Sequence, residues 1–148
     1  MEIKTHPQVK ILSSSNRTTL QQLGQFGPVM QEMYEEIISK KVFISGPLCW
    51  IYHGLDGNPD TEFTLEIAIP VEGKMQSDKF TVKELAPFKA LVYTHDGPFE
   101  QLPDSYKHIM RYVDENKIPI LDESREVYLN IDFERPQNNI TQIQVGVF

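Results

Sequence analysis

The 148-residue sequence contains a single cysteine, no long apolar run and no segment that resembles a secretion signal. Cys49 cannot form an intramolecular disulfide, and its apolar surroundings predict a buried, unreactive thiol rather than a nucleophile. No apolar stretch approaches the roughly 20 residues that a helix needs to span a bilayer. We therefore expect a cytoplasmic protein without a membrane segment.

Basic residues are outnumbered by acidic ones, 14 to 21, which gives a formal net charge of −7. Such a chain is repelled by nucleic acid backbones, and no basic stripe offsets this repulsion, so direct nucleic acid binding is not expected. The four histidines lack the spacing of metal ligands, and no glycine-rich phosphate-binding loop opens a helix. The sequence thus predicts no bound metal and no cofactor.

Apolar periodicity predicts an α+β fold in a single domain, residues 1–148. Helical spacing indicates helices over 26–40 and 102–113, each with a proline near its start. We predict strands at 9–14, 48–53, 63–71, 79–85, 88–94, 125–133 and 143–147, with short extended segments at 42–44 and 118–120. The strand at 63–71 is expected to pair antiparallel with the strand at 48–53.

The strand predicted at 125–133 has an unusual second face. Its alternation is expected to place four apolar side chains in the core, namely Val127, Leu129, Ile131 and Phe133. The other face carries Glu126, Tyr128, Asn130 and Asp132. Two interpretations are open: an ordinary solvated face, or a carboxylate at the floor of an aromatic-lined pocket.

The two halves of the chain match without a gap at a fixed offset of 76 residues, from the helix to the last strand. The matched pairs include Phe26 with Leu102, Met33 with Ile109, Ile37 with Val113, Ile51 with Val127, Ile67 with Ile143 and Val71 with Val147. We interpret this pattern as a duplicated strand-helix-strand-strand unit, covering about residues 8–72 and about 86–148. Two such units are expected to pack about a pseudo-twofold axis and to form a groove at their junction.

At the same offset Trp50 corresponds to Glu126, and Tyr52 corresponds to Tyr128. If the axis passes between these strands, the indole and the carboxylate approach each other, and the two tyrosines flank them. A carboxylate in such a place favours a cationic ligand, and each aromatic face adds roughly 0.5–2 kcal/mol per good cation–π contact. Plain core packing of Trp50 and both tyrosines remains the alternative.

Several segments resemble the GyrI-like small-molecule-binding domains. These are Glu126-Val127-Tyr128-Leu129-Asn130, the later Ile143-Gln144-Val145-Gly146-Val147, the stretch His95 to Leu102 with its Gly-Pro-aromatic core, and Phe63 to Val71 with Glu66. The family includes effector-binding domains of multidrug-response transcription regulators, and this chain is similar to the stand-alone members. Where family members often have tyrosine after Gly-Pro, this sequence has Phe99.

The resemblance implies a duplicated α+β fold with a central groove and an acidic floor, here Glu126. Some stand-alone relatives hydrolyse strained cyclopropane-bearing electrophiles with a tryptophan and a glutamate, which would correspond to Trp50 and Glu126. Other relatives bind and inhibit DNA gyrase.

Three functions are therefore carried forward. The first is binding of amphipathic, cationic or planar small molecules, as a sensor or sink, with Glu126 as the charge and walls from Trp50, Tyr52, Tyr128, Tyr93 and Tyr34. The second is hydrolysis in the same groove, with Glu126 as general base and Trp50 steadying a developing cation. The third is interaction with a protein partner, either gyrase or a regulator.

Overall fold

The computed structural model describes residues 1–148 and shows one curled antiparallel sheet with two main helices. In chain order the elements are β1 (Glu2–His6), β2 (Val9–Thr18), η1 (Leu20–Gln25), α1 (Gly27–Ser39), β3 (Phe43–Ile44), β4 (Cys49–His53), β5 (Phe63–Glu72), β6 (Thr81–Leu85), β7 (Phe88–Asp96), η2 (Phe99–Gln101), α2 (Leu102–Asn116), β8 (Ile120–Asn130), η3 (Pro136–Asn138) and β9 (Ile140–Val147). The predicted α+β fold is confirmed. Neither helix has the length and apolar character needed to cross a membrane.

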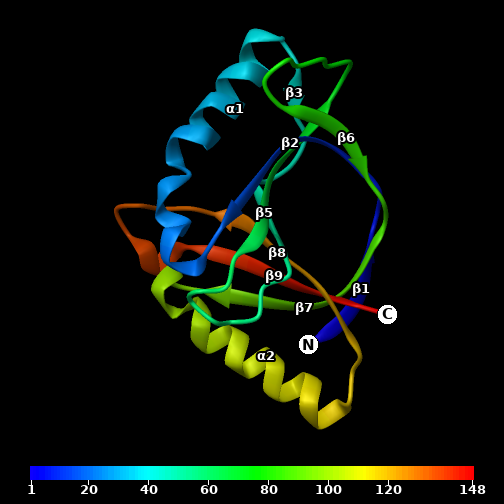
Figure 1. The fold of residues 1–148 in the computed structure, drawn as a ribbon, viewed down its shortest axis with the longest axis vertical. Coiled ribbons are helices and arrows are strands. Elements are labelled where there is room, and N and C mark those ends of the chain that lie inside the picture. Colours follow the sequence, from blue (N-terminus) through cyan, green and yellow to red (C-terminus); the bar gives the residue numbers. More distant parts are fainter.

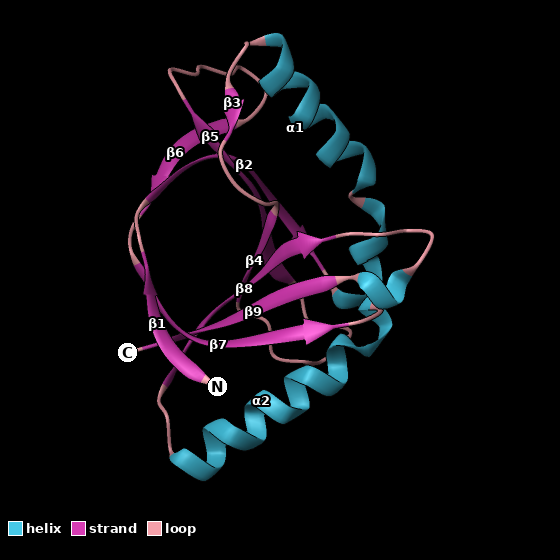
Figure 2. Cartoon of the chain, turned by 180° about the vertical axis from the view of Figure 1, so that it is seen from behind, coloured by secondary structure: helices cyan, strands magenta, loops and turns pink.

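The sheet has the strand order β1-β7-β9-β8-β4-β5-β2-β6, and β3 pairs with the end of β5. Both helices lie on one side of this sheet, while β1 and β6 curl round on the other (Figure 1). The view from behind shows the same arrangement, with α1 over one half of the sheet and α2 over the other (Figure 2). The central strands therefore have one face toward the helices and one toward the interior of the curl.

Each helix packs its predicted apolar stripe on its own half of the sheet. Met33 and Ile37 of α1 are fully buried in the same cluster as the β5 residues Leu65, Ile67 and Ile69. A second cluster joins Ile109 and Val113 of α2 to Ile143, Val145 and Val147 of β9. A third, smaller cluster with Ile11, Cys49, Ile51 and Ala68 fills the inner face of the curl. The two predicted helices are confirmed, and the burial of their apolar stripes on the sheet stabilises them.

The strands are arranged symmetrically about the centre of the sheet, where β4 pairs antiparallel with β8. On one side lie β5 and β2, and on the other lie β9 and β7, with one helix connecting the strands of each half. In the central ladder Trp50 is the Cα partner of Glu126. The offset of 76 residues predicts this pairing, although descent of the halves from one duplicated unit stays a prediction.

The prediction that the apolar side chains of residues 125–133 lie in the core is wrong for the second half of the segment. β8 ends at Asn130, and Leu129, Ile131 and Phe133 are exposed, Phe133 by 88%. The strand stops because Asp132 Oδ1 accepts hydrogen bonds from the backbone N–H groups of Glu134 and Arg135, which turns the chain. Toward the helices, β8 instead buries Glu126 and half-buries Tyr128, both on the face predicted to be polar.

Other strand boundaries also differ from the prediction, including those of β1, β2 and β9. β1 was not predicted, because Glu2–His6 is largely exposed and pairs only along the edge of β7. β2 continues to Thr18 through a polar segment, because β5 pairs with it as far as Thr18, whereas β6 pairs only with Val9 to Ser13. β9 begins at Ile140 rather than at residue 143. Backbone pairing with neighbours overrides the weak side-chain signal in each case.

A bulge in β8 lies opposite Gly146 of β9. Ile120 pairs with Val147 and Ser124 pairs with Val145, so three residues of β8 face Gly146 alone. A Cβ atom at Gly146 would lie 2.8 Å from the carbonyl oxygen of Glu123 and 3.1 Å from side-chain atoms of Leu121 and Phe88. The glycine therefore lets two backbone segments approach closely.

Gly146→Ala should lower the free energy of unfolding by about 1–3 kcal/mol, because the backbone on the opposite side of the bulge cannot move away cheaply. Urea denaturation measures the loss. Gly24→Ala is the matched control, since nothing lies within 4 Å of the added Cβ atom. Equal stability of the two variants would contradict the close approach.

Candidate functional site

The side chain of Glu126 is enclosed between the sheet and the helices. Only 5% of the residue is exposed. The hydroxyls of Tyr52 (β4) and Tyr128 (β8) donate to its Oε1 at 2.9 and 2.7 Å, and the hydroxyl of Tyr106 (α2) donates to Oε2 at 2.6 Å. The interpretation of Glu126 as part of a solvated face is therefore wrong.

The three donors around Glu126 are all neutral. No lysine, arginine or histidine nitrogen forms an ion pair with this carboxylate, although seven such pairs occur elsewhere in the chain. An ionised carboxylate accepts only, so three phenol O–H groups suit its negative form. Hydrogen bonding from neutral groups stabilises the anion but leaves its net charge in place.

The tyrosines remain protonated donors. Burial raises the pKa of Tyr52, Tyr106 and Tyr128 well above 10, and the negative charge of Glu126 raises each of them further. None of the three can therefore ionise at neutral pH, and the site carries one centre of negative charge.

Aromatic rings surround this charge. The ring of Trp50 meets the ring of Tyr128 edge to face at 6.0 Å and that of Phe26 at 6.1 Å, and Phe99 meets Tyr128 at 5.7 Å. The indole Nε1–H of Trp50 is buried and has no hydrogen-bond partner. Edge-to-face pairs leave ring faces available for other contacts, and the free N–H is a donor that a bound molecule can use.

A histidine holds the segment that precedes α2. His95 is 5% exposed. Its Nδ1 lies 2.7 Å from the hydroxyl oxygen of Ser105, and its Nε2 donates to the carbonyl oxygen of Pro98 at 3.0 Å. Ser105 precedes Tyr106, and Pro98 precedes Phe99, so this linkage fixes both aromatic neighbours of the Glu126 site. His95 is thus structural and supports the rim of the site.

The structure brings together most, but not all, of the predicted site residues. Trp50, Tyr52 and Tyr128 lie beside Glu126 as the offset predicts. Tyr34 packs against the α1 cluster, and Tyr93 lies 5.2 Å from the ring of His108, so neither makes a hydrogen bond to Glu126. Their participation in binding stays a prediction.

Three aromatic neighbours were missed: Tyr106, Phe26 and Phe99. Tyr106 belongs to the apolar stripe of α2, and sequence periodicity treats it as packing. The available signal was its hydroxyl, because a tyrosine on a buried helix face needs a polar partner. The partner could not be identified without knowing where α2 crosses β8.

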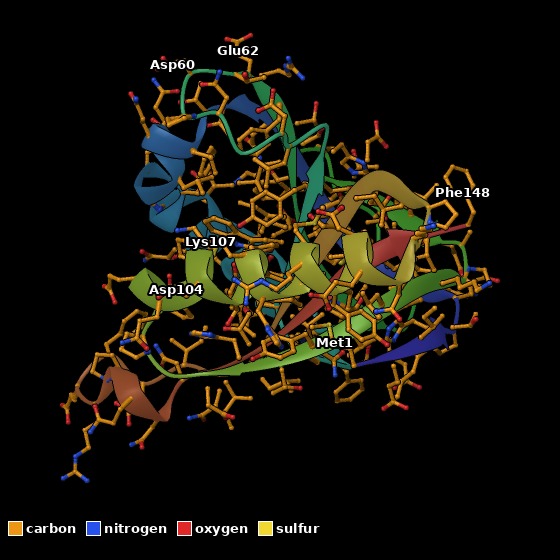
Figure 3. All side chains as sticks on the ribbon, turned by 90° about the horizontal axis from the view of Figure 1, so that it is seen from below. Met1, Asp60, Glu62, Asp104, Lys107 and Phe148 are labelled. Carbon is orange, nitrogen blue, oxygen red and sulfur yellow. The ribbon has the colours of Figure 1, made fainter.

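Cys49 is buried on the opposite face of β4 and is 9% exposed. Burial raises the pKa of its thiol to about 12, so the thiolate is absent at neutral pH. The predicted unreactive thiol is confirmed. Asp60 and Glu62 project outward from the loop between β4 and β5, as Figure 3 shows, which agrees with a solvated turn.

The carboxylate of Glu126 is covered, and three tyrosine hydroxyls contact it. Two surface hollows lie away from Glu126, one beside Met1, Tyr93 and Gln142 and the other beside Glu32, Glu36 and Lys79. Because Glu126 is 5% exposed, a molecule that reaches its carboxylate must displace side chains that cover it, such as Tyr106 of α2.

The sequence and the fold were compared with known proteins. The family described as the GyrI-like small molecule binding domain matches residues 1–147. Comparison with curated protein sequences gives no match.

Solved structures of similar fold cover nearly the whole chain. The EcmrR C-terminal domain superposes with a TM-score of 0.86 at 15% identity, covering 99% of this chain and 96% of that one. SAV2435 bound to tetraphenylphosphonium gives a TM-score of 0.69 at 15% identity, covering 99% and 93%. A hydrolase from Listeria innocua gives 0.71 at 12% identity, covering 99% and 91%. These likenesses establish the fold, and the family match over residues 1–147 establishes the relationship: the chain belongs to the family of GyrI-like small-molecule-binding domains.

Proposed function

We propose that this domain binds amphipathic, cationic or planar small molecules, and that Glu126 supplies the attraction. One observation carries the proposal: a carboxylate that is 5% exposed has three neutral hydrogen-bond donors and no cationic partner. Buried carboxylates in proteins are normally paired with a cation, because burying an isolated charge costs several kcal/mol. A cationic ligand would supply the missing partner.

The aromatic shell suits the apolar part of such a ligand. Trp50, Tyr128, Phe26 and Phe99 form edge-to-face contacts in one continuous group. Lipophilic cations have a delocalised or shielded charge, so they lose little hydration on entry and gain cation–π contacts with such rings. The relative SAV2435 binds tetraphenylphosphonium, which is a molecule of this kind, and its likeness in fold supports the choice of probe.

Tyr106 holds the site closed in the absence of a ligand. Its hydroxyl donates to Glu126 Oε2, and it is the one donor that α2 rather than the sheet contributes. A ligand would take this contact, and Tyr106 would move away with the neighbouring part of α2. The two sheet donors, Tyr52 and Tyr128, would continue to orient the carboxylate.

Tetraphenylphosphonium should stabilise the wild-type protein in a thermal-shift assay and bind measurably by calorimetry. Glu126→Gln should weaken binding roughly tenfold or more, because the amide keeps the volume and loses the charge. Glu62→Gln is the matched control, since it removes the same formal charge from an exposed loop. Equal affinity of both variants would contradict a role for Glu126.

Tyr106→Phe should lower the free energy of unfolding by about 1–3 kcal/mol, because a hydrogen bond to a buried charged group is lost. The same variant should bind the cation no more weakly than wild type, since the ligand displaces this contact. Tyr112→Phe, on the same helix, should change stability by less than about 0.5 kcal/mol, because the Tyr112 hydroxyl makes no hydrogen bond. Denaturation and calorimetry measure both effects.

Hydrolysis is the second candidate, and the adjacency of Trp50 and Glu126 in the β4–β8 ladder favours it. In such a reaction Glu126 would accept a proton from water attacking the electrophile, and the indole would face the developing positive charge. A hydrolase from Listeria innocua shares the fold. The three phenol donors weigh against it, because they occupy the carboxylate that would act as base.

Product analysis separates the two functions. A cyclopropane-bearing electrophile incubated with the protein should remain unchanged if the domain only binds. Turnover by wild type that is lost in both Trp50→Phe and Glu126→Gln would establish the hydrolase instead.

A further inference from the structure

A second buried carboxylate lies on the reverse face of the strands that carry the Glu126 site. Glu66 of β5 is 4% exposed. Its Oε2 accepts a hydrogen bond from the hydroxyl of Ser13 (β2) at 2.5 Å and pairs with Lys83 Nζ (β6) at 2.5 Å. Unlike Glu126, this carboxylate is compensated by cationic partners, so it serves the fold rather than a cationic ligand.

The imidazole of His53 lies between two carboxylates from different strands. Its Nε2 is 3.2 Å from Glu66 Oε1, and its Nδ1 is 3.6 Å from Glu123 Oε1. His53 belongs to β4, and the two acids belong to β5 and β8, its neighbours on either side. Only the protonated imidazolium can donate from both nitrogens, because the neutral ring has one N–H and one acceptor.

The other charges of this face complete a row across the sheet. Arg125 of β8 donates from Nε and Nη2 to Glu123 Oε2 at 2.9 and 2.8 Å, and its guanidinium lies 3.8 Å from the ring centre of Phe88 (β7). Lys83 closes the row at its other end, on Glu66. The charges that face His53 are thus Glu66, Glu123 and, through Glu66, Lys83.

We propose that protonated His53 is a clamp that joins β5 to β8 across β4, and that its proton controls how firmly the centre of the sheet is held. The clamp is built on the reverse face of the strands that carry Trp50 and Glu126, and it needs no ligand. Deprotonation removes the positive charge that lies between the two carboxylates, while the neutral ring can keep its hydrogen bond to Glu66.

The charge environment favours the protonated ring. Hydrogen bonding to Glu66 raises the pKa of His53 above its usual 6.5, against the opposing effects of burial and of Lys83, while the negative charge of Glu123 adds to the rise. Burial alone would raise the pKa of Glu66, but hydrogen bonds from His53, Lys83 and Ser13 lower it to about 2. The carboxylate of Glu66 therefore remains charged at every pH at which His53 titrates.

The direction of the pH effect follows from the raised pKa. The folded protein binds the proton of His53 more tightly than the unfolded chain does. The stabilisation is thus fully present below the unfolded pKa and is lost as the pH rises through the folded pKa. Proton release between these limits weakens the attachment of β4 to β5 and β8.

Titration of the His53 ring protons by NMR tests the clamp directly. The folded pKa should lie above 6.5, and Glu123→Gln should move it toward that value because one of the two carboxylates is removed. His108, which is exposed on α2, provides an internal reference that Glu123→Gln should leave unchanged. A His53 that titrates at or below 6.5 in wild type would overturn the proposal.

Urea denaturation at about pH 5.5 and about pH 8.5 gives the second readout. The urea concentration at the midpoint of unfolding should be lower at the higher pH, and this decrease should be larger for wild type than for His53→Gln. His108→Gln should show the same decrease as wild type. An unchanged difference in His53→Gln would count against the clamp. If His53→Gln does not fold, the Glu123→Gln variant decides by the same comparison, because it leaves the ring in place and removes one partner.

Discussion

An unneutralised carboxylate inside the protein, that of Glu126, is the constraint on which the rest of the structure depends. Its negative charge is accommodated by three phenol hydroxyls that arrive from β4, β8 and α2. These donors require the central strands to pair in one register and α2 to cross the sheet at one place. The packing of both helices is therefore tied to a polar centre as well as to their apolar stripes, and polar centres of this kind are costly when any partner is removed.

Each face of the sheet centre buries a glutamate, but the two glutamates have different partners. Toward the helices, Glu126 has neutral hydrogen-bond partners and aromatic neighbours, so no cation of the chain balances its charge. Toward the interior of the curl, Glu66 pairs with Lys83 and His53, so its charge is balanced by side chains of the chain itself. At comparable burial, 5% and 4%, the two glutamates thus differ in their partners, and this difference is the basis on which we propose a binding role for Glu126 alone.

The sequence was sufficient for the parts of the structure that repeat a simple period. Two of these signals are local, namely the helical stripe that contains Met33 and Ile37 and the alternation from Phe63 to Val71. The pairing of Trp50 with Glu126 is not local, but the constant offset of 76 residues related the two positions. The contribution of Tyr106 could not be predicted, because it depends on how α2 is placed over β8. The exposure of Leu129 and Phe133 was missed because the turn at Asp132 ends the strand before its alternation does.

Alternation along β4 has a consequence for how this domain can change in evolution. Trp50 and Tyr52 face the helices, whereas Cys49, Ile51 and His53 face the curl, so inserting or deleting one residue would exchange the two sets. The indole would then enter the interior, and the imidazole would meet Glu126. Near this pair, a change of length is therefore tolerated better in the flanking loops, residues 54–62 and 131–139, than within β4.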